Sequence, residues 1–153
     1  MSAPILVGYD GSDNAKDAIV RAGELFPGHP AIVLNAWEPL SSVAAVPPVP
    51  GLEGALRKGL DEMDEVGAQA SARLADEGAG LAKEAGLEAE AVTHRSEGRA
   101  WRSIVALARE RDVLAIVVGR RGISGIEQAL LGSVSGGVLR HADRPVVVIP
   151  EQD

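Results

Sequence analysis

The chain has 153 residues, 46% of them hydrophobic and 24% charged, a mixture that predicts one globular domain over 1–153. Its formal net charge of −7 argues against nucleic acid as the main partner, because phosphate-backbone binding depends on clustered Lys and Arg. The sequence has no cysteine, which excludes disulfides and thiolate chemistry, and no apolar run approaches the roughly 20 residues that span a bilayer. We therefore expect a cytoplasmic protein with no membrane partner.

The first third of the chain predicts strand, helix, strand. Residues 5–10 form a short apolar run ended by a polar residue, which indicates a buried strand. Apolar residues at helical spacing then predict a helix over 15–26, with Ser12 or Asp13 as its N-cap. A turn-forming Pro-Gly-His-Pro segment ends this helix, and residues 31–37 predict a second buried strand.

The middle of the chain divides into a loop and a helix. Residues 38–59 are rich in Pro and Gly, and we expect them to form one long irregular surface loop. Residues 60–85 are rich in Ala, Glu and Lys and predict a helix, although its internal glycines weaken the pattern. The expected buried side of this helix carries Leu60, Met63, Ala70, Leu74 and Leu81.

The last part of the chain predicts three more strands and two helices. Residues 87–93 alternate in polarity and indicate a strand near a sheet edge, followed by an amphipathic helix over 101–108. The dense apolar run 113–118 is typical of a central parallel strand covered on both faces. A short helix over 134–139 and a final strand over 145–149 complete the order.

Strands that alternate with helices predict an α/β fold: one open parallel five-stranded sheet with right-handed crossovers and helices on both faces. In such sheets ligands bind beyond the carboxyl ends of the strands, where the strand order reverses. The places where we expect a site are therefore Tyr9-Asp10, Ala36-Trp37 and the residues just after Val118.

A glycine-rich pattern follows Val118. It reads Gly119-Arg120-Arg121-Gly122, then nine residues, then Gly132-Ser133-Val134-Ser135 leading into a helix. Glycine lets a backbone approach a ligand closely, and the free N–H groups and dipole at a helix N-terminus attract phosphate. The serine hydroxyls and the arginine charges add to the same place, so the pattern predicts an anion site.

The spacing Gly-two-Gly-nine-Gly-Ser-x-Ser resembles the signature of the ATP-binding universal stress proteins. The first strand ending in Asp10 and the C-terminal Arg-Pro-Val-Val-Val-Ile strand agree with it, so the resemblance covers essentially the whole chain. It implies a Rossmann-like fold of the adenine nucleotide alpha hydrolase type, with sheet order 3-2-1-4-5. It also implies ATP as ligand, with Mg²⁺ or Mn²⁺ bound through the phosphates, and a stress-response role as a nucleotide-dependent switch or binding module.

The resemblance also implies a role for each part of the site. Asp10 would bind ribose, Ala36 would meet adenine through its backbone, the segment 118–122 would wrap the ribose and α-phosphate, and 132–135 would hold the β- and γ-phosphates. The candidate nucleotide-binding residues are Gly8, Tyr9, Asp10, Ala36, Val118, Gly119, Arg120, Gly122, Gly132, Ser133, Val134 and Ser135.

Plainer interpretations remain open for these residues. Glycines after a strand are often only turn residues. Asp10 can cap the helix that follows it, which is compatible with ribose binding. The two arginines can be solvated surface charges. The three histidines, His29, His94 and His141, are scattered along the chain and do not predict a metal site, and the two tryptophans, Trp37 and Trp101, are expected to pack.

Three functions are compatible with the pattern: an ATP-binding module, a slow ATPase, and a binder of AMP or cyclic AMP. The motif contains no carboxylate or histidine placed as a general base, Glu127 being the nearest, so no catalytic residue is assigned. The segment 132–135 favours a triphosphate. We also expect a homodimer, because no charge interrupts residues 146–149 on a predicted sheet edge.

Overall fold

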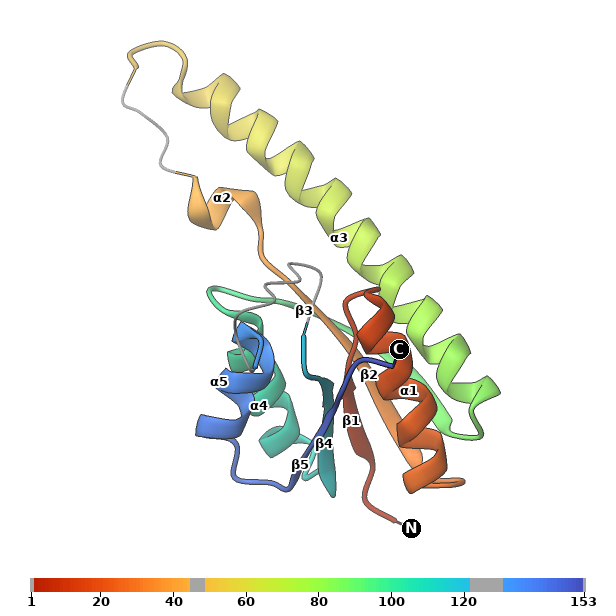
Figure 1. Cartoon of the computed structure of the whole chain (residues 1–153). Helices are drawn as coiled ribbons and strands as arrows, with labels where there is room; N and C mark the ends of the chain where they lie inside the picture. Colours follow the sequence, from red (N-terminus) through yellow and green to blue (C-terminus); the bar gives the residue numbers. More distant parts are fainter. Residues whose placement is uncertain (1, 45–48, 122–130, 153) are drawn as a thin grey trace.

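The computed structural model describes residues 2–44, 49–121 and 131–152, and its five strands form one parallel sheet (Figure 1). The strand order is β3-β2-β1-β4-β5, as the resemblance implied. The strands are β1 (Ile5–Gly8), β2 (Pro30–Trp37), β3 (Glu88–Arg95), β4 (Ala115–Gly119) and β5 (Val146–Ile149). The helices are α1 (Asp13–Leu25), α2 (Leu40–Val43), α3 (Glu53–Glu84), α4 (Ala100–Glu110) and α5 (Ser133–His141).

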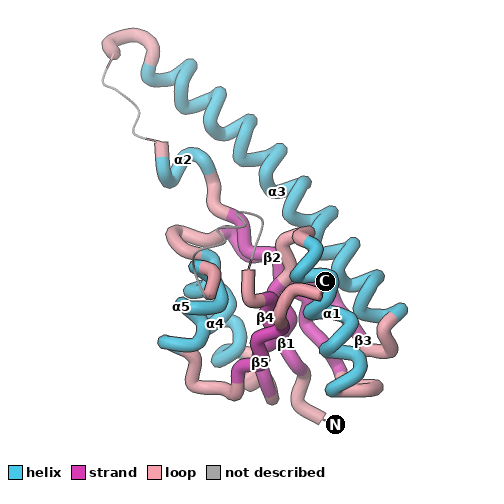
Figure 2. The backbone as a smooth tube through the Cα atoms, in the orientation of Figure 1, coloured by secondary structure: helices cyan, strands magenta, loops and turns pink. Residues whose placement is uncertain are grey.

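Helices cover both faces of the sheet, with α1 and α3 on one side and α4 and α5 on the other (Figure 2). Side chains alternate between the two faces along each strand. Ile5 and Val7 of β1 therefore enter the core beneath α1 and α3, whereas Leu6 enters the core beneath α4 and α5. This two-sided burial accounts for the continuous apolar runs in β1, β2 and β4.

The chain reverses direction across the sheet at β1. It passes from β1 outward to β2 and β3, then returns to place β4 on the other side of β1, with Ile5 opposite Ala31 on one side and Ala115 on the other. After the carboxyl ends of β1 and β4 the chain therefore runs to opposite sides of the sheet. Such a switch point leaves a crevice at the top of the sheet, which is where ligands bind in open α/β folds.

The prediction that residues 38–59 form one irregular loop was wrong in two places. Residues 40–43 form α2, and α3 already begins at Glu53 and runs for 32 residues. A Cβ placed on Gly54 or Gly59 would meet nothing within 4 Å, so these glycines lie in open space and only weaken the helix locally. Among the described residues, no helix has the length and apolar composition that crossing a membrane needs.

The N-terminal part of α3 projects beyond the sheet (Figure 1). Met63, predicted to be buried, is therefore 59% exposed, whereas Leu74 and Leu81 pack against the core as expected. The helix is continuous through the internal glycines that weakened its sequence pattern. Gly78 lets the helix lie directly on the sheet, because a Cβ there would come within 2.8 Å of the Tyr9 ring.

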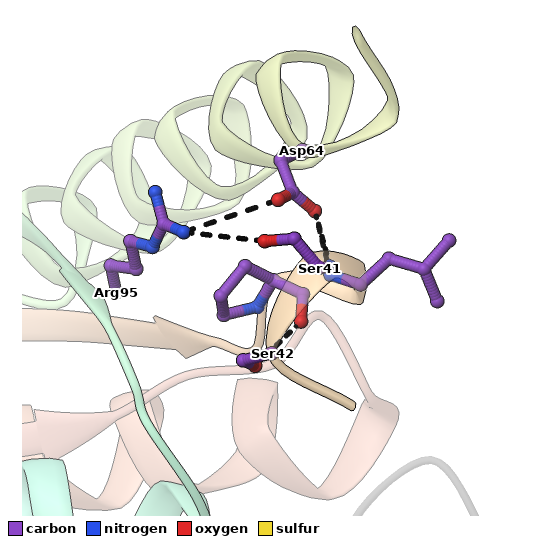
Figure 3. Close-up of polar contacts among 6 residues, drawn as sticks. Ser41, Ser42, Asp64 and Arg95 are labelled. Atoms are coloured by element: carbon purple, nitrogen blue, oxygen red, sulfur yellow. Dashed lines mark hydrogen bonds and ion pairs between the residues drawn. The ribbon is translucent and has the colours of Figure 1, made fainter. Parts of the chain in front are cut away.

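A polar cluster attaches α2 to α3 (Figure 3). Asp64 of α3 is buried, and its Oδ1 accepts hydrogen bonds from the backbone N–H groups of Leu40 at 2.6 Å and Ser41 at 3.3 Å. Arg95, at the end of β3, approaches the other carboxylate oxygen at 4.0 Å and donates to the Ser41 hydroxyl. Hydrogen bonding to Ser41 lowers the pKa of Asp64 below that of an ordinary aspartate.

Candidate functional site

A cavity of about 280 Å³ opens at the carboxyl ends of β1, β2 and β4. It contains every sequence-predicted site residue except Gly122, which lies outside the described residues, as does Glu127. The described residues that line it are Gly8, Tyr9, Asp10, Ala15, Leu34, Asn35, Ala36, Ala100, Ile104, Val118, Gly119, Arg120, Arg121, Gly132, Ser133, Val134 and Ser135. The fold thus brings together residues from five segments of the sequence: 8–15, 34–36, 100–104, 118–121 and 132–135.

The end of β1 supplies one carboxylate. Asp10 is partly exposed, and its Oδ1 accepts a hydrogen bond from the Ser12 backbone N–H at 2.9 Å. Ser12 in turn is the N-cap of α1 and accepts from the Ala15 N–H. Asp10 therefore orders the turn into α1. Its second carboxylate oxygen remains available to accept hydrogen bonds from a ligand.

Tyr9 takes part in this end of the cavity through its backbone and not through its hydroxyl. Its side chain is 3% exposed, and its hydroxyl donates to Glu77 of α3, on the face of the sheet opposite α4 and α5. Burial and this carboxylate raise the pKa of Tyr9 above its ordinary range. The Tyr9 carbonyl accepts a hydrogen bond from the Asn35 side chain at 2.8 Å, which ties the ends of β1 and β2 together.

Asn35 is a site residue that the sequence interpretation missed. It is 5% exposed and lines the cavity beside Ala36. Besides its bond to Tyr9, its Oδ1 accepts a hydrogen bond from Ser71 of α3 at 2.7 Å. A polar residue inside the apolar run of β2 was the available signal, because a buried amide needs partners on both of its polar atoms.

The loop after β4 packs against the start of α1. A Cβ on Gly119 would lie 2.8 Å from the Oδ1 atom of Asn14, so the neighbouring side chain already requires glycine here, whatever a ligand requires. The Arg121 backbone N–H donates to the same Oδ1 at 2.9 Å. Asn14 is thus a second residue that the sequence interpretation missed, and it lies just behind the cavity.

Arg120 connects the loop to its neighbours through its backbone. Its N–H donates to the Ile149 carbonyl at 2.8 Å, and its carbonyl accepts from the Gly132 N–H at 2.7 Å. The Arg120 Nε is buried, and no acceptor among the described residues contacts it. Arg121, one-fifth exposed at its side chain, lies 3.9 Å from Glu151 in an ion pair.

Helix α5 begins at the cavity with Gly132 as its N-cap, and no described side chain caps it. Its first-turn N–H groups are the orphan donors of a helix N-terminus, where the dipole favours negative charge. Ser133 is exposed, whereas Ser135 is 1% exposed and donates its hydroxyl to the Arg120 carbonyl at 2.8 Å. Ser135 therefore holds the helix start against the loop after β4.

The remaining polar and aromatic candidates lie outside the cavity lining. His94 pairs with the Ser103 hydroxyl, and His141 stacks on Trp101 with ring centroids 4.2 Å apart. Trp37 packs over Gly67 of α3, and the Arg95 guanidinium lies 5.9 Å from its ring centroid. Within the described ranges, no three His, Cys, Asp or Glu residues are grouped so that they could hold a metal ion.

Comparison with known proteins gives consistent matches. Residues 1–150 match the model of the universal stress protein family. A Thermus aquaticus protein described as "Universal stress protein in QAH/OAS sulfhydrylase 3'region" is 31% identical over 151 residues, or 97% of this chain and 99% of the relative.

Two solved structures extend the comparison to the fold. The universal stress protein of Archaeoglobus fulgidus in complex with dAMP has a TM-score of 0.63 and 23% identity, covering 95% of this chain and 96% of that one. A universal stress protein in complex with cAMP has a TM-score of 0.62 and 26% identity, covering 99% and 98%. Both likenesses extend over nearly the whole sheet and its helices.

Proposed function

The chain belongs to the universal stress protein family, and we propose from that premise that it binds ATP as a nucleotide-dependent switch or binding module in a stress response. One observation carries the proposal: a single cavity unites the Asp10 carboxylate, the loop after β4 and the start of α5, which no described side chain caps. The complexes of two related folds with dAMP and with cAMP support an adenine nucleotide as the ligand class.

The adenosine half of the ligand would occupy the part of the cavity between β1 and β2. The second carboxylate oxygen of Asp10 would accept hydrogen bonds from ribose hydroxyls, since Oδ1 is already engaged by Ser12. The backbone of Ala36, held in place by the neighbouring Asn35 bonds, would meet the base. The apolar walls formed by Leu34 and Ile104 suit a planar base.

The phosphate half would lie between the loop after β4 and the start of α5. The first-turn N–H groups of α5 and its dipole attract an anion without any lysine. The buried Arg120 Nε, with no described acceptor, would gain one in a phosphate oxygen. Donors on both the loop after β4 and the start of α5 could bind more than one phosphate group, which favours ATP over AMP or cyclic AMP.

A divalent cation, Mg²⁺ or Mn²⁺, would be held mainly by the phosphates of the bound nucleotide. The described lining offers one carboxylate, Asp10, and the exposed Ser133 hydroxyl as oxygen donors, a set compatible with a cation that keeps several waters. When bound, the cation would neutralise phosphate charge. The chain's own part is to orient the phosphates through Arg120 and the α5 backbone.

The site supports binding more than turnover. Among the described lining residues Asp10 is the only carboxylate, and no histidine lines the cavity. Asp10 already orders the turn into α1 through Ser12, which suits a fixed acceptor rather than a group that exchanges protons with water. We therefore keep a slow ATPase as the second candidate function and assign no catalytic residue.

We further propose that the protein forms a homodimer through β5. The sheet has two edges, β3 and β5. The β3 edge carries charged residues, Glu88, Glu90 and Arg95, which discourage pairing with another chain. The four residues of β5 are Val-Val-Val-Ile, and pairing with a second copy about a two-fold axis would satisfy their outward backbone groups.

The experiment that tests the nucleotide proposal is identification of the ligand that the protein carries when purified. Denaturation followed by chromatography of the released small molecules separates ATP, ADP, AMP and cyclic AMP. We expect ATP or its product ADP, and addition of ATP with Mg²⁺ to the stripped protein should raise its melting temperature by mass action. A Gly132→Leu variant that folds but keeps the full shift would contradict the assignment of the phosphate site.

A further inference from the structure

Asn14 joins three parts of the structure that meet behind the cavity. It lies in the first turn of α1, is 4% exposed and does not line the cavity itself. Its Oδ1 accepts the Arg121 backbone N–H at 2.9 Å, and its Nδ2 donates to the Ile149 carbonyl at 3.1 Å. Both polar atoms of the amide are therefore satisfied by the backbone of other elements, the loop after β4 and the end of β5.

The packing around Asn14 is as close as its hydrogen bonding. A Cβ on Gly119 would come 2.8 Å from the Asn14 Oδ1 and 2.9 Å from its Cγ. The backbone of residues 119–121 thus rests on the flat amide of Asn14 along one side and is hydrogen-bonded to it at Arg121. A shorter side chain at position 14 would leave a cavity beneath this loop and two buried backbone groups with one partner fewer.

The loop that Asn14 supports is also connected to α5. The Ile149 carbonyl accepts a second hydrogen bond from the Arg120 N–H, and the Arg120 carbonyl accepts from both the Gly132 N–H and the Ser135 hydroxyl. Asn14 therefore contacts the loop after β4, and this loop in turn contacts helix α5. The loop and the helix carry every described donor that the proposed phosphate site would use.

We propose that Asn14 is the positioning residue for the phosphate half of the site: it fixes the backbone of residues 119–121 and, through Arg120, the start of α5. The inference rests on the proposed nucleotide function and deepens it, because it states which half of the ligand depends on this residue. No described side-chain hydrogen bond joins Asn14 to Asp10 or Ala36, so we expect the adenosine half of the site to depend on it far less.

The test compares ATP and adenosine, which differ only in the triphosphate. Affinities of the wild type, Asn14→Ala and the control Ser96→Ala are measured by calorimetry on stripped protein. Ser96 is 3% exposed, donates to the Gly98 carbonyl and is not among the cavity-lining residues, so its loss tests for a general effect of removing a buried polar side chain. We expect Asn14→Ala to weaken the binding of ATP about tenfold and that of adenosine less than about twofold. In Ser96→Ala the affinities for both ligands should stay nearly unchanged.

Hydrogen exchange gives a second readout, which separates a local loss of support for the loop after β4 from a general loss of stability. In Asn14→Ala the amide N–H groups of Arg120 and Arg121 should exchange faster, while that of Tyr9 keeps its wild-type rate. If Asn14→Ala does not fold, Asn14→Ser takes its place, since a hydroxyl is polar but too short to span both partners.

The possible failures are distinguishable. A wild type that binds neither ATP nor adenosine overturns the nucleotide function and this inference together. If the wild type binds ATP and the Asn14 variant keeps the same ratio of ATP to adenosine affinity, only the positioning role is overturned. Unchanged exchange at Arg120 and Arg121 also overturns it.

Discussion

Gly137 of α5 lies directly against the indole of Trp101 in α4: a Cβ at position 137 would come 2.2 Å from the Trp101 Cγ. The two helices that cover one face of the sheet can therefore approach each other closely only because residue 137 has no side chain. Trp101 also stacks on the His141 ring, with centroids 4.2 Å apart, and packs against the core beneath α4 and α5. Since α5 begins at the cavity, this contact also sets where its N-terminus lies.

Substitution of Gly137 should destabilise the fold. We expect Gly137→Ala to lower the free energy of unfolding by about 1–3 kcal/mol, because the added methyl group overpacks a filled site. Denaturant unfolding measures the change. The control is Gly80→Ala in α3, where a Cβ meets nothing within 4 Å and the better helix propensity should be neutral or stabilising by up to about 1 kcal/mol. Equal stability of the two variants would contradict the α4–α5 contact.

The hydroxyl of Tyr9 should matter for stability and not for nucleotide binding. Tyr9 is the only tyrosine, so near-ultraviolet absorbance follows its ionisation alone. Burial and Glu77 raise the pKa of Tyr9 in the folded state. The contribution of the protonated hydroxyl to folding stability is therefore complete below the unfolded pKa of about 10 and is lost as the pH rises above that value.

We expect Tyr9→Phe to lower the free energy of unfolding by roughly 1 kcal/mol through the lost hydrogen bond to Glu77, and to change ATP affinity less than about twofold. A tyrosine that titrates near pH 10 in the folded protein would contradict the contact with Glu77.

The attachment of α2 to α3 should depend on the charge of Asp64. Hydrogen bonding to Ser41 lowers the pKa of this carboxyl in the folded state. The contribution of the carboxylate to folding stability is therefore complete above the unfolded pKa of about 3.9 and is lost as the pH falls through the lower folded pKa. NMR titration of the Leu40 and Ser41 amide signals should give an apparent pKa below that of an unfolded aspartate. The Asp64→Asn variant should abolish this titration, and amide signals that titrate above pH 4 would be the opposite result.

The homodimer can be tested through the backbone of β5 alone. The Pro145 carbonyl accepts from Ile116 of β4 and the Ile149 carbonyl from Arg120 just after it, so by alternation the N–H of Val148 points away from β4. Val148→Pro removes this outward donor and leaves the ladder to β4 intact. We expect light scattering to give a dimer mass for the wild type at micromolar concentration and a monomer mass for Val148→Pro. A monomeric wild type, or a variant that remains dimeric, would rule out this interface.

The sheet was predictable because its signals are local. The apolar runs of β1, β2 and β4 are buried on both faces, and each predicted strand end lies within two residues of the observed one. The start of α3 was missed because Gly54 and Gly59 counted against a helix. Met63 was placed on the buried side because its spacing continues the helical pattern, although the sheet does not extend that far.

The site was predictable only in part, since its supports depend on contacts between distant residues. The predicted lining residues were found from the strand ends and the glycine spacing, whereas Asn35 was missed. Asn14 could not be found in this way, because its partners Arg121 and Ile149 lie 107 and 135 residues away in the sequence. For the same reason the glycine at 119 was interpreted as room for a ligand, whereas Asn14 already occupies that side. The ATP ligand, the cation, the dimer and the cytoplasmic location stay predictions.

Calorimetric titration of ATP with Mg²⁺ into stripped protein tests the central claim most directly. The predicted result is saturable binding of one ATP per chain, weakened about tenfold in Asp10→Ala, which loses the acceptor proposed for ribose. The free energy of unfolding of that variant is measured beside it, because Asp10 also orders the Ser12 turn. A folded wild type that gives no binding heat and no rise in melting temperature with millimolar ATP would contradict the account.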